Sequence, residues 1–170
     1  MQERNVLILV VVLVVATAGA GVAVNAFRNA NSSAFRAFDL SVDVRGTPTV
    51  GSDVQITITV RQAFIDARSL SNLFLSVDMG TLAVHGGTPS TNPWASPTVW
   101  NLTGLDLSGP RVYNITAAPT ANGSATLDAM VWVPLGDLRS VSVDPSGHVN
   151  TADISLLATQ SAPLTVGATG

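Results

Sequence analysis

The chain has no cysteine and no lysine, and glutamate occurs only once, at Glu3. Without cysteine the chain can form no disulfide framework and no thiolate metal or redox site. Charged residues make up 11% of the sequence, against about 25% in an average protein. The net charge of −3 argues against a nucleic-acid partner, which requires a basic patch. A surface with so few charges must stay soluble through Ser, Thr and Asn, through glycans, or by burial in an assembly.

Residues typical of catalytic and metal sites are also scarce. His85 and His148 are the two histidines, whereas a metal centre needs three or four ligands with supporting groups. His85-Gly86-Gly87 is similar to the oxyanion loop of lipase-like hydrolases, but the chain lacks the Gly-x-Ser-x-Gly elbow of that class. Paired carboxylates for glycoside chemistry are not evident either, because the aspartates are scattered. We therefore predict no catalytic residue, no metal site and no cofactor.

One loose cluster of oxygen-bearing side chains remains, consisting of Asp144, Ser146, Asn150 and Asp153. It lacks the EF-hand pattern of alternating ligands, a glycine at the sixth position and a distal glutamate. Asp144-Pro145-Ser146-Gly147 is a strong turn sequence, in which Asp and Ser side chains bond their own backbone. We favour this turn over a calcium site.

The longest apolar run is Val6–Val24, nineteen residues without a charge. As a helix it would be about 28 Å long, close to the ~30 Å hydrocarbon core of a bilayer. It is either an uncleaved membrane anchor or a signal peptide, since small residues suited to cleavage follow Val6–Val15. Both interpretations send the rest of the chain across the membrane. We assign residues 1–25 to the anchor or signal peptide, 26–37 to a juxtamembrane linker and 38–170 to one domain.

The apolar period changes to two from Phe38 onward. Apolar and polar residues alternate over 38–45 and over 54–61, which is typical of strands with one buried face. Ala63–Ser71 predicts a short helix or turn, and Gly86–Pro97 a long loop. Further strands are predicted at Leu73–Val77, Leu82–His85, Thr98–Leu102, Arg111–Ala117, Ala125–Val133, Arg139–Val143, Asp153–Thr159 and Pro163–Val166. Nine or ten short strands predict an all-β fold, an antiparallel β-sandwich, with Pro163 placing the last strand at a sheet edge.

Two segments resemble the Ig-like domains of CARDB type found in archaeal and bacterial surface proteins. In Pro48–Val60 a Pro-x-x-Gly turn leads into a long β-branched strand. Trp100–Leu105 is followed by Gly109, an alternating strand, Gly123 and the strand Ala125–Val133. The resemblance implies an Ig-like sandwich of seven or more strands, with a binding or spacer role and no catalytic residues.

Two kinds of candidate site remain. Four Asn-x-Ser/Thr sequons, at Asn31, Asn101, Asn114 and Asn122, are acceptors for N-linked glycans in a translocated chain, or else are unmodified surface asparagines. Among the three tryptophans, Trp100 and Trp132 are expected in the core. Trp94 lies in the predicted loop and is the candidate for binding a ligand or partner.

Together these features predict a non-enzymatic extracytoplasmic protein of the cell membrane or cell surface, or a secreted one. The predicted Ig-like module acts through contacts with other surface proteins or with itself, in envelope structure, adhesion or a filament. An apolar N-terminal helix with a glycosylated sandwich head resembles archaeal pilin-like subunits, although the basic-Gly processing site is absent. The alternative is a domain that binds a glycan or small ligand through the loop Gly86–Trp100.

Overall fold

The computed structural model of this chain describes residues 37–168. Val6–Val24 and Asn31 lie outside these residues. Among the residues described, no helix is long and apolar enough to cross a membrane. The strands in this range are β1 (Phe38–Arg45), β2 (Val54–Gln62), β3 (Phe74–Asp78), β4 (Leu82–Gly87), β5 (Val99–Asn101), β6 (Arg111–Pro119), β7 (Gly123–Pro134) and β8 (Ile154–Val166).

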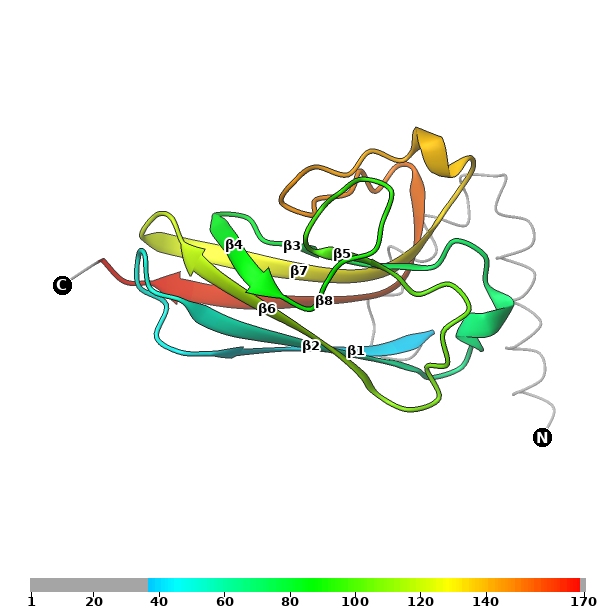
Figure 1. Cartoon of the computed structure of the whole chain (residues 1–170), viewed down its shortest axis with the longest axis horizontal. Coiled ribbons are helices and arrows are strands. Elements are labelled where there is room, and N and C mark those ends of the chain that lie inside the picture. The colour runs from blue at the N-terminus through cyan, green and yellow to red at the C-terminus, as the bar shows by residue number, and fades with distance from the viewer. Residues whose placement is uncertain (1–36, 169–170) are drawn as a thin grey trace. The chain divides into compact units, whose positions relative to one another are not determined.

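The strands form two antiparallel sheets that pack face to face (Figure 1). Sheet A has the order β1-β2-β6-β4, and sheet B has the order β5-β3-β7-β8. The prediction of an all-β antiparallel sandwich is confirmed in this part of the chain. The last strand, β8, lies at an edge of its sheet as Pro163 predicted.

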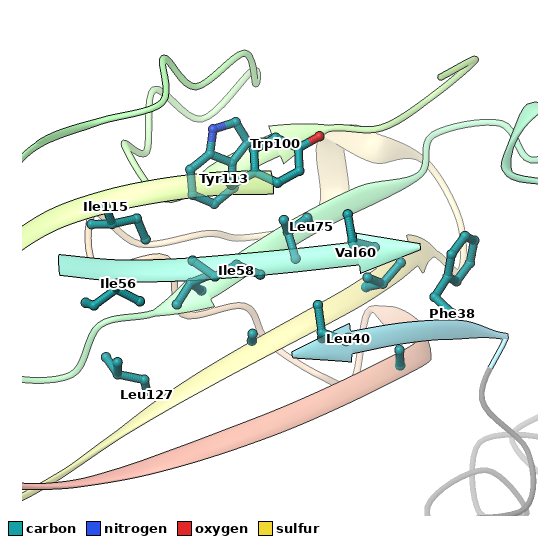
Figure 2. Packing of buried hydrophobic residues seen from close by; sticks show 14 of the residues in the cluster. Phe38, Leu40, Ile56, Ile58, Val60, Leu75, Trp100, Tyr113, Ile115 and Leu127 are labelled. Carbon is teal, nitrogen blue, oxygen red and sulfur yellow. The ribbon is translucent and has the colours of Figure 1, made fainter. Parts of the chain in front are cut away.

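The main core lies between the two sheets, and the alternation of each strand builds it. In sheet A, Leu40 pairs with Val60 across β1 and β2, and Ile58 pairs with Tyr113 across β2 and β6. Cross-strand partners face the same side of a sheet, so these residues bury one continuous apolar face. Figure 2 shows them packed with Leu75 and Trp100, which come from sheet B. Phe38 is fully buried in this core.

Sheet B is covered on both faces only in part, because Thr126 and Ser161, which lie further along its outer face, are exposed. Leu75 and Val131 point into the main core, whereas their neighbours Phe74, Met130 and Trp132 belong to a second apolar cluster on the outer face. That outer cluster is completed by residues from two long connections, 88–98 and 135–153, among them Val141 and Val149. These connections therefore form a third layer on sheet B, while sheet A has a single apolar face.

Three of the four sheet edges are joined or capped by backbone hydrogen bonds at one or two points. The backbone N–H of Ala37 donates to the carbonyl of Leu157 near the start of β1. Beyond the other end of β1, the Gly167 N–H donates to the Pro48 carbonyl and the Val50 N–H donates to the Gly167 carbonyl, so β1 and β8 are joined at both ends. The β5 edge is capped by the bond from the Asn101 N–H to the Thr91 carbonyl. Strand β4 has β6 on one side and, within the described residues, no strand on the other.

Several boundaries differ from the sequence-based predictions. The strand predicted at Arg139–Val143 is wrong. That stretch holds the 3-10 helix η2 (Leu138–Ser140), capped by the side chain of Asp137, and then only an isolated bridge between Val143 and Val149. The two strands predicted after residue 153 are one strand, β8. Eight strands, not nine or ten, are present in the described range, and Gly86 and Gly87 belong to β4 instead of the long loop. The predicted turn at 63–71 contains the 3-10 helix η1 (Ala67–Ser69).

Candidate interaction surfaces

The outer face of sheet A is an uncovered array of polar side chains. The register aligns them in rows across three strands: Ser41 with Thr59 and Val112, Asp43 with Thr57 and Asn114, and Arg45 with Gln55 and Thr116. Two cross-strand hydrogen bonds order the array. The Thr57 hydroxyl donates to the Asn114 side-chain oxygen at 3.1 Å, and the Thr116 hydroxyl donates to the Gln55 side-chain oxygen at 3.1 Å. We call this surface, with Asp39 and Arg61 at its end, the polar face.

Three of the four charges of the polar face lie at its two ends, and the fourth, Asp43, lies in the row of Thr57 and Asn114. Asp39 stands at the start of the strand opposite Arg61, and Arg45 stands at its end, where its Nε lies 2.9 Å from an Asp43 carboxylate oxygen. Both members of the Asp43–Arg45 pair are largely exposed, and exposed ion pairs contribute little to stability. The Arg45 guanidinium thus remains available to a second carboxylate.

Trp94, the predicted binding residue, lies half-buried in the third layer. Its ring contacts Phe74 edge-on at 5.1 Å between centroids and lies 5.6 Å from Trp132, and these two rings stack on each other at 4.9 Å. Its indole N–H donates to the Val141 carbonyl at 2.9 Å, which ties the connection 88–98 to the connection 135–153. Trp94 therefore has a packing task, and its role in binding stays a prediction. Trp100 and Trp132 are buried, as predicted.

Asn92 organises the connection that carries Trp94. Its side-chain amide donates to the carbonyls of Ser96 and Val99 at 2.7 and 2.8 Å, and its oxygen accepts from the N–H groups of Trp94 and Ser96. Four hydrogen bonds use the full capacity of one Asn side chain. The predicted long loop is consequently held in one conformation by the Asn92 side chain. Sequence reasoning missed Asn92 because the fold determines its hydrogen-bond partners.

The cluster around Asp144 is a turn that bonds itself. One Asp144 carboxylate oxygen accepts from the Ser146 hydroxyl at 2.6 Å and from the N–H groups of Ser146 and His148. The bond from the Ser146 hydroxyl, followed by those from the backbone, lowers the pKa of Asp144 below its ordinary 3.8. The self-bonded turn predicted from the sequence is confirmed. Among residues 37–168 no group of three or more His, Asp or Glu is placed to hold a metal ion.

The two histidines lie apart. His148 Nδ1 is 2.8 Å from an Asp78 carboxylate oxygen, so the turn at 144–148 is fastened to the end of β3. His85 is exposed at the irregularity between Val84 and Gly86 in the β4–β6 pairing. His85 and His148 therefore share no site within the described range.

The structure separates the sequons. Asn101 ends β5, Asn114 lies at the centre of the polar face, and Asn122 lies in the turn between β6 and β7; all three are exposed.

The second apolar cluster was not predicted, although the sequence contains a signal for it. The five consecutive apolar residues Ala129–Val133 are typical of a strand that is buried on both faces.

These features define a two-sheet β-sandwich in which one outer face is partly covered and the other is open. No family model and no curated protein matches the chain. Among solved structures it is similar to a cohesin module from a family 33 glycoside hydrolase of Clostridium perfringens, at 10% identity and a TM-score of 0.46 over 79% of this chain and 99% of that chain. It is also similar to AggA, the major subunit of aggregative adherence fimbriae type I from Escherichia coli, at 11% identity and a TM-score of 0.37 over 79% of this chain and 97% of that chain. At such values no partner can be transferred to this chain.

Proposed function

We propose that this chain is a non-enzymatic protein of the cell surface, held at the membrane through Val6–Val24, whose Ig-like sandwich works by protein–protein contact. The observation that carries the proposal is the contrast between the two outer faces. The apolar part of the outer face of sheet B is covered by the chain's own third layer, whereas the outer face of sheet A is left open along its length and bears ordered polar side chains. The open face is where a partner docks.

The composition of the polar face suits a protein contact. Its two middle rows hold one charge, Asp43, among uncharged side chains that include Val112, which is 49% exposed. Its other charges lie at the ends. Protein interfaces likewise have few charges at their centre and a polar, solvent-accessible rim. Because Thr57 and Asn114 already bond each other, less side-chain freedom is lost when a partner binds.

The partner we propose is a second copy of this chain. Asp39 and Arg45 stand at opposite ends of β1 on the same face. When two copies meet face to face with their β1 strands antiparallel, each Asp39 lies opposite the other copy's Arg45. A two-fold contact of this kind is self-complementary, and the opposite charges favour this orientation.

The size of the face limits the strength of this contact. Three strands of about eight residues cover roughly 25 by 14 Å, or about 350 Å² per copy, whereas a stable interface buries about 800 Å² per partner. Copies in dilute solution should therefore be mostly monomeric. Confinement to a membrane raises the effective concentration, so the contact is expected at the surface of a bilayer.

Cross-linking of the full chain in proteoliposomes tests the proposal, because the natural chain has no cysteine. A Ser41→Cys variant places one thiol on the polar face, and a Ser142→Cys variant places one in the third layer; both serines are exposed. A short bis-maleimide is expected to give dimers of the Ser41→Cys chain and not of the Ser142→Cys control.

Charge exchange in the Ser41→Cys background tests the orientation. Asp39→Arg and Arg45→Asp should each reduce cross-linking several-fold, because each brings like charges together, and the double variant should restore it. Equal cross-linking from both faces, or no rescue in the double variant, would contradict the proposed contact.

Intact mass and N-terminal sequencing of the native protein decide between a retained anchor and a cleaved signal peptide.

A further inference from the structure

The three sequons that the structure describes differ in how firmly the fold holds them. In an Asn-x-Ser/Thr acceptor, both the Asn amide and the hydroxyl two residues later must be accessible to the transferase. Hydrogen bonds and strand pairing limit this access to different degrees at Asn101, Asn114 and Asn122.

Asn114 and its hydroxyl partner are engaged in sheet A. The Asn114 side-chain oxygen accepts from Thr57, and the Thr116 hydroxyl donates its proton to Gln55. The sequon lies in β6, which has β2 on one side and β4 on the other. A transferase would have to open a central strand to reach it, and such opening approaches the cost of global unfolding.

Asn101 is held in a different way. Its side-chain oxygen accepts the N–H of Thr103 at 2.9 Å. The Thr103 hydroxyl accepts the N–H of Leu73 at 3.0 Å and lies 3.5 Å from the Leu73 carbonyl. The hydroxyl of this sequon is thus part of the link between the segment after β5 and the start of β3.

Asn122 is unrestrained by comparison. Asn122 itself lies in the turn between β6 and β7, whereas Gly123 and Ser124 begin β7 and pair with the end of the edge strand β8. Both Asn122 and Ser124 are exposed. Neither side chain hydrogen-bonds to another described residue. The middle residue is Gly123, with φ +119°, so no side chain shields the amide. A turn and the end of a strand pair open at a lower free-energy cost than the middle of a central strand.

We propose that a glycan is transferred to the folded domain, and that Asn122 therefore carries an N-linked glycan whereas Asn101 and Asn114 do not. In the reaction, Nδ2 of Asn122 attacks the anomeric carbon of a sugar linked through phosphate to a lipid. The carbon–nitrogen bond forms, the bond from that carbon to the phosphate oxygen breaks, the lipid phosphate leaves with the electron pair, and an amide proton passes to a base of the transferase.

This inference rests on the proposed location outside the membrane, and it has a consequence for the proposed contact. A glycan on Asn114 would cover the centre of the polar face, whereas a glycan on Asn122 sits on a turn at the end of the sheets. The selection of Asn122 therefore leaves the polar face open to the second copy.

Glycopeptide mapping of the full chain, expressed in its own cells and extracted from membranes, tests the assignment. The peptide with Asn122 is expected to carry the glycan mass, and the peptides with Asn101 and Asn114 to be unmodified. Asn122→Gln and Ser124→Ala should each remove that mass, and the matched variants Asn101→Gln and Asn114→Gln should retain it. An unmodified Asn122, or comparable occupancy of Asn101 or Asn114, overturns the assignment.

Failure of this inference is distinguishable from failure of the proposed function. The location of the domain is measured separately by thiol labelling of intact cells, which does not depend on glycans. The contact is measured by Ser41→Cys cross-linking, which Asn122→Gln should leave unchanged. An externally labelled, cross-linking protein without a glycan at Asn122 would overturn the glycan assignment alone.

Discussion

Trp94 shows how a residue that looks like a binding site in the sequence can be a packing residue in the fold. Its ring completes a cluster with Phe74 and Trp132, and its indole N–H bonds the Val141 carbonyl. Aromatic pairs contribute about 0.5–1.5 kcal/mol beyond the area that they bury. Trp94 therefore links the two connections that form the third layer.

We expect Trp94→Ala to lower the free energy of unfolding by about 2–3 kcal/mol, below the 3–5 kcal/mol typical of a fully buried Trp, because the ring is half-buried. Urea unfolding of the purified chain measures this loss. Trp94→Phe, which keeps an aromatic ring but loses the bond to Val141, should cost less. Unchanged stability in Trp94→Ala, together with loss of binding to a glycan or small ligand, would instead support the predicted binding role.

Gly147 is required by both its conformation and its surroundings. Its φ is +88°, and a Cβ there would overlap the Val77 carbonyl oxygen and the Thr98 hydroxyl. Gly51 also has a positive φ, +78°, but faces open space, and Gly136 faces open space without a positive φ. Alanine substitutions at these three glycines therefore distinguish the cost of backbone strain from the cost of steric overlap.

Gly147→Ala is expected to cost about 3–4 kcal/mol, Gly51→Ala about 1–2 kcal/mol and Gly136→Ala close to zero. The order of the three losses follows because only Gly147 combines strain with overlap. Chemical denaturation of the three variants measures it. A Gly147→Ala protein as stable as Gly51→Ala would show that Val77 and Thr98 move aside easily.

At the scale of elements, the third layer is fastened by short polar turns as well as by apolar side chains. The turn at 144–148 is closed by Asp144 and tied to β3 through His148 and Asp78. The pKa of Asp144 is lowered first by its bond from the Ser146 hydroxyl. The pKa of Asp66 is lowered by the Arg68 side chain, and that of Asp106 by the Ser108 hydroxyl.

These shifts predict that the protein loses stability in acid. A carboxylate whose pKa is depressed in the folded state stabilises the fold fully above its unfolded value, near 3.8, and that stabilisation is lost as the pH falls through the folded pKa. Urea unfolding should therefore give a lower free energy at pH 3 than at pH 6.

Asp144→Asn identifies the contribution of the turn, because an amide oxygen can still accept a hydrogen bond but does not titrate in this range. The difference in unfolding free energy between pH 6 and pH 3 should be smaller in Asp144→Asn than in the natural chain. The remaining difference reflects Asp66, Asp106 and the other carboxylates. An identical pH dependence in the two proteins would show that Asp144 gains nothing from the turn.

The elements that sequence reasoning predicted well are those with one buried face. β1 and β2 alternate apolar and polar residues because their inner sides form the core and their outer sides form the polar face. The stretch at Arg139–Val143 alternates too, yet it forms no strand. Its Val141 and Val143 pack onto the outer cluster from a connection, and the Asp137 cap favours a 3-10 turn.

The candidate surfaces were harder to predict, since they depend on partners distant in sequence. Asn114 reads as a sequon, but its bond to Thr57 and its central place on the polar face appear only when β2 pairs with β6. Trp94 reads as an exposed loop residue because nothing local shows that Val141 will lie against it. The sequence thus predicts the kinds of residue at the surface and not which of them the fold leaves accessible.

At the scale of the whole molecule, an apolar N-terminal segment precedes a domain whose polar face is uncovered. The third layer covers the apolar part of the outer face of sheet B, and three of the four sheet edges are joined or capped by backbone hydrogen bonds. The polar face of sheet A is uncovered, and we propose it as the surface that meets a partner. The scarcity of charge, 11% of residues, fits a protein whose surface is partly covered by glycan and by neighbouring copies.

The most direct test of this account is where the domain lies in the cell. Ser52→Cys places a single thiol in the exposed turn between β1 and β2 of a chain that otherwise has no cysteine, so the natural chain serves as an unlabelled control. The account predicts that a membrane-impermeant maleimide labels the Ser52→Cys protein in intact cells to the same extent as after lysis. Labelling only after lysis would place the domain inside the cell and contradict the account.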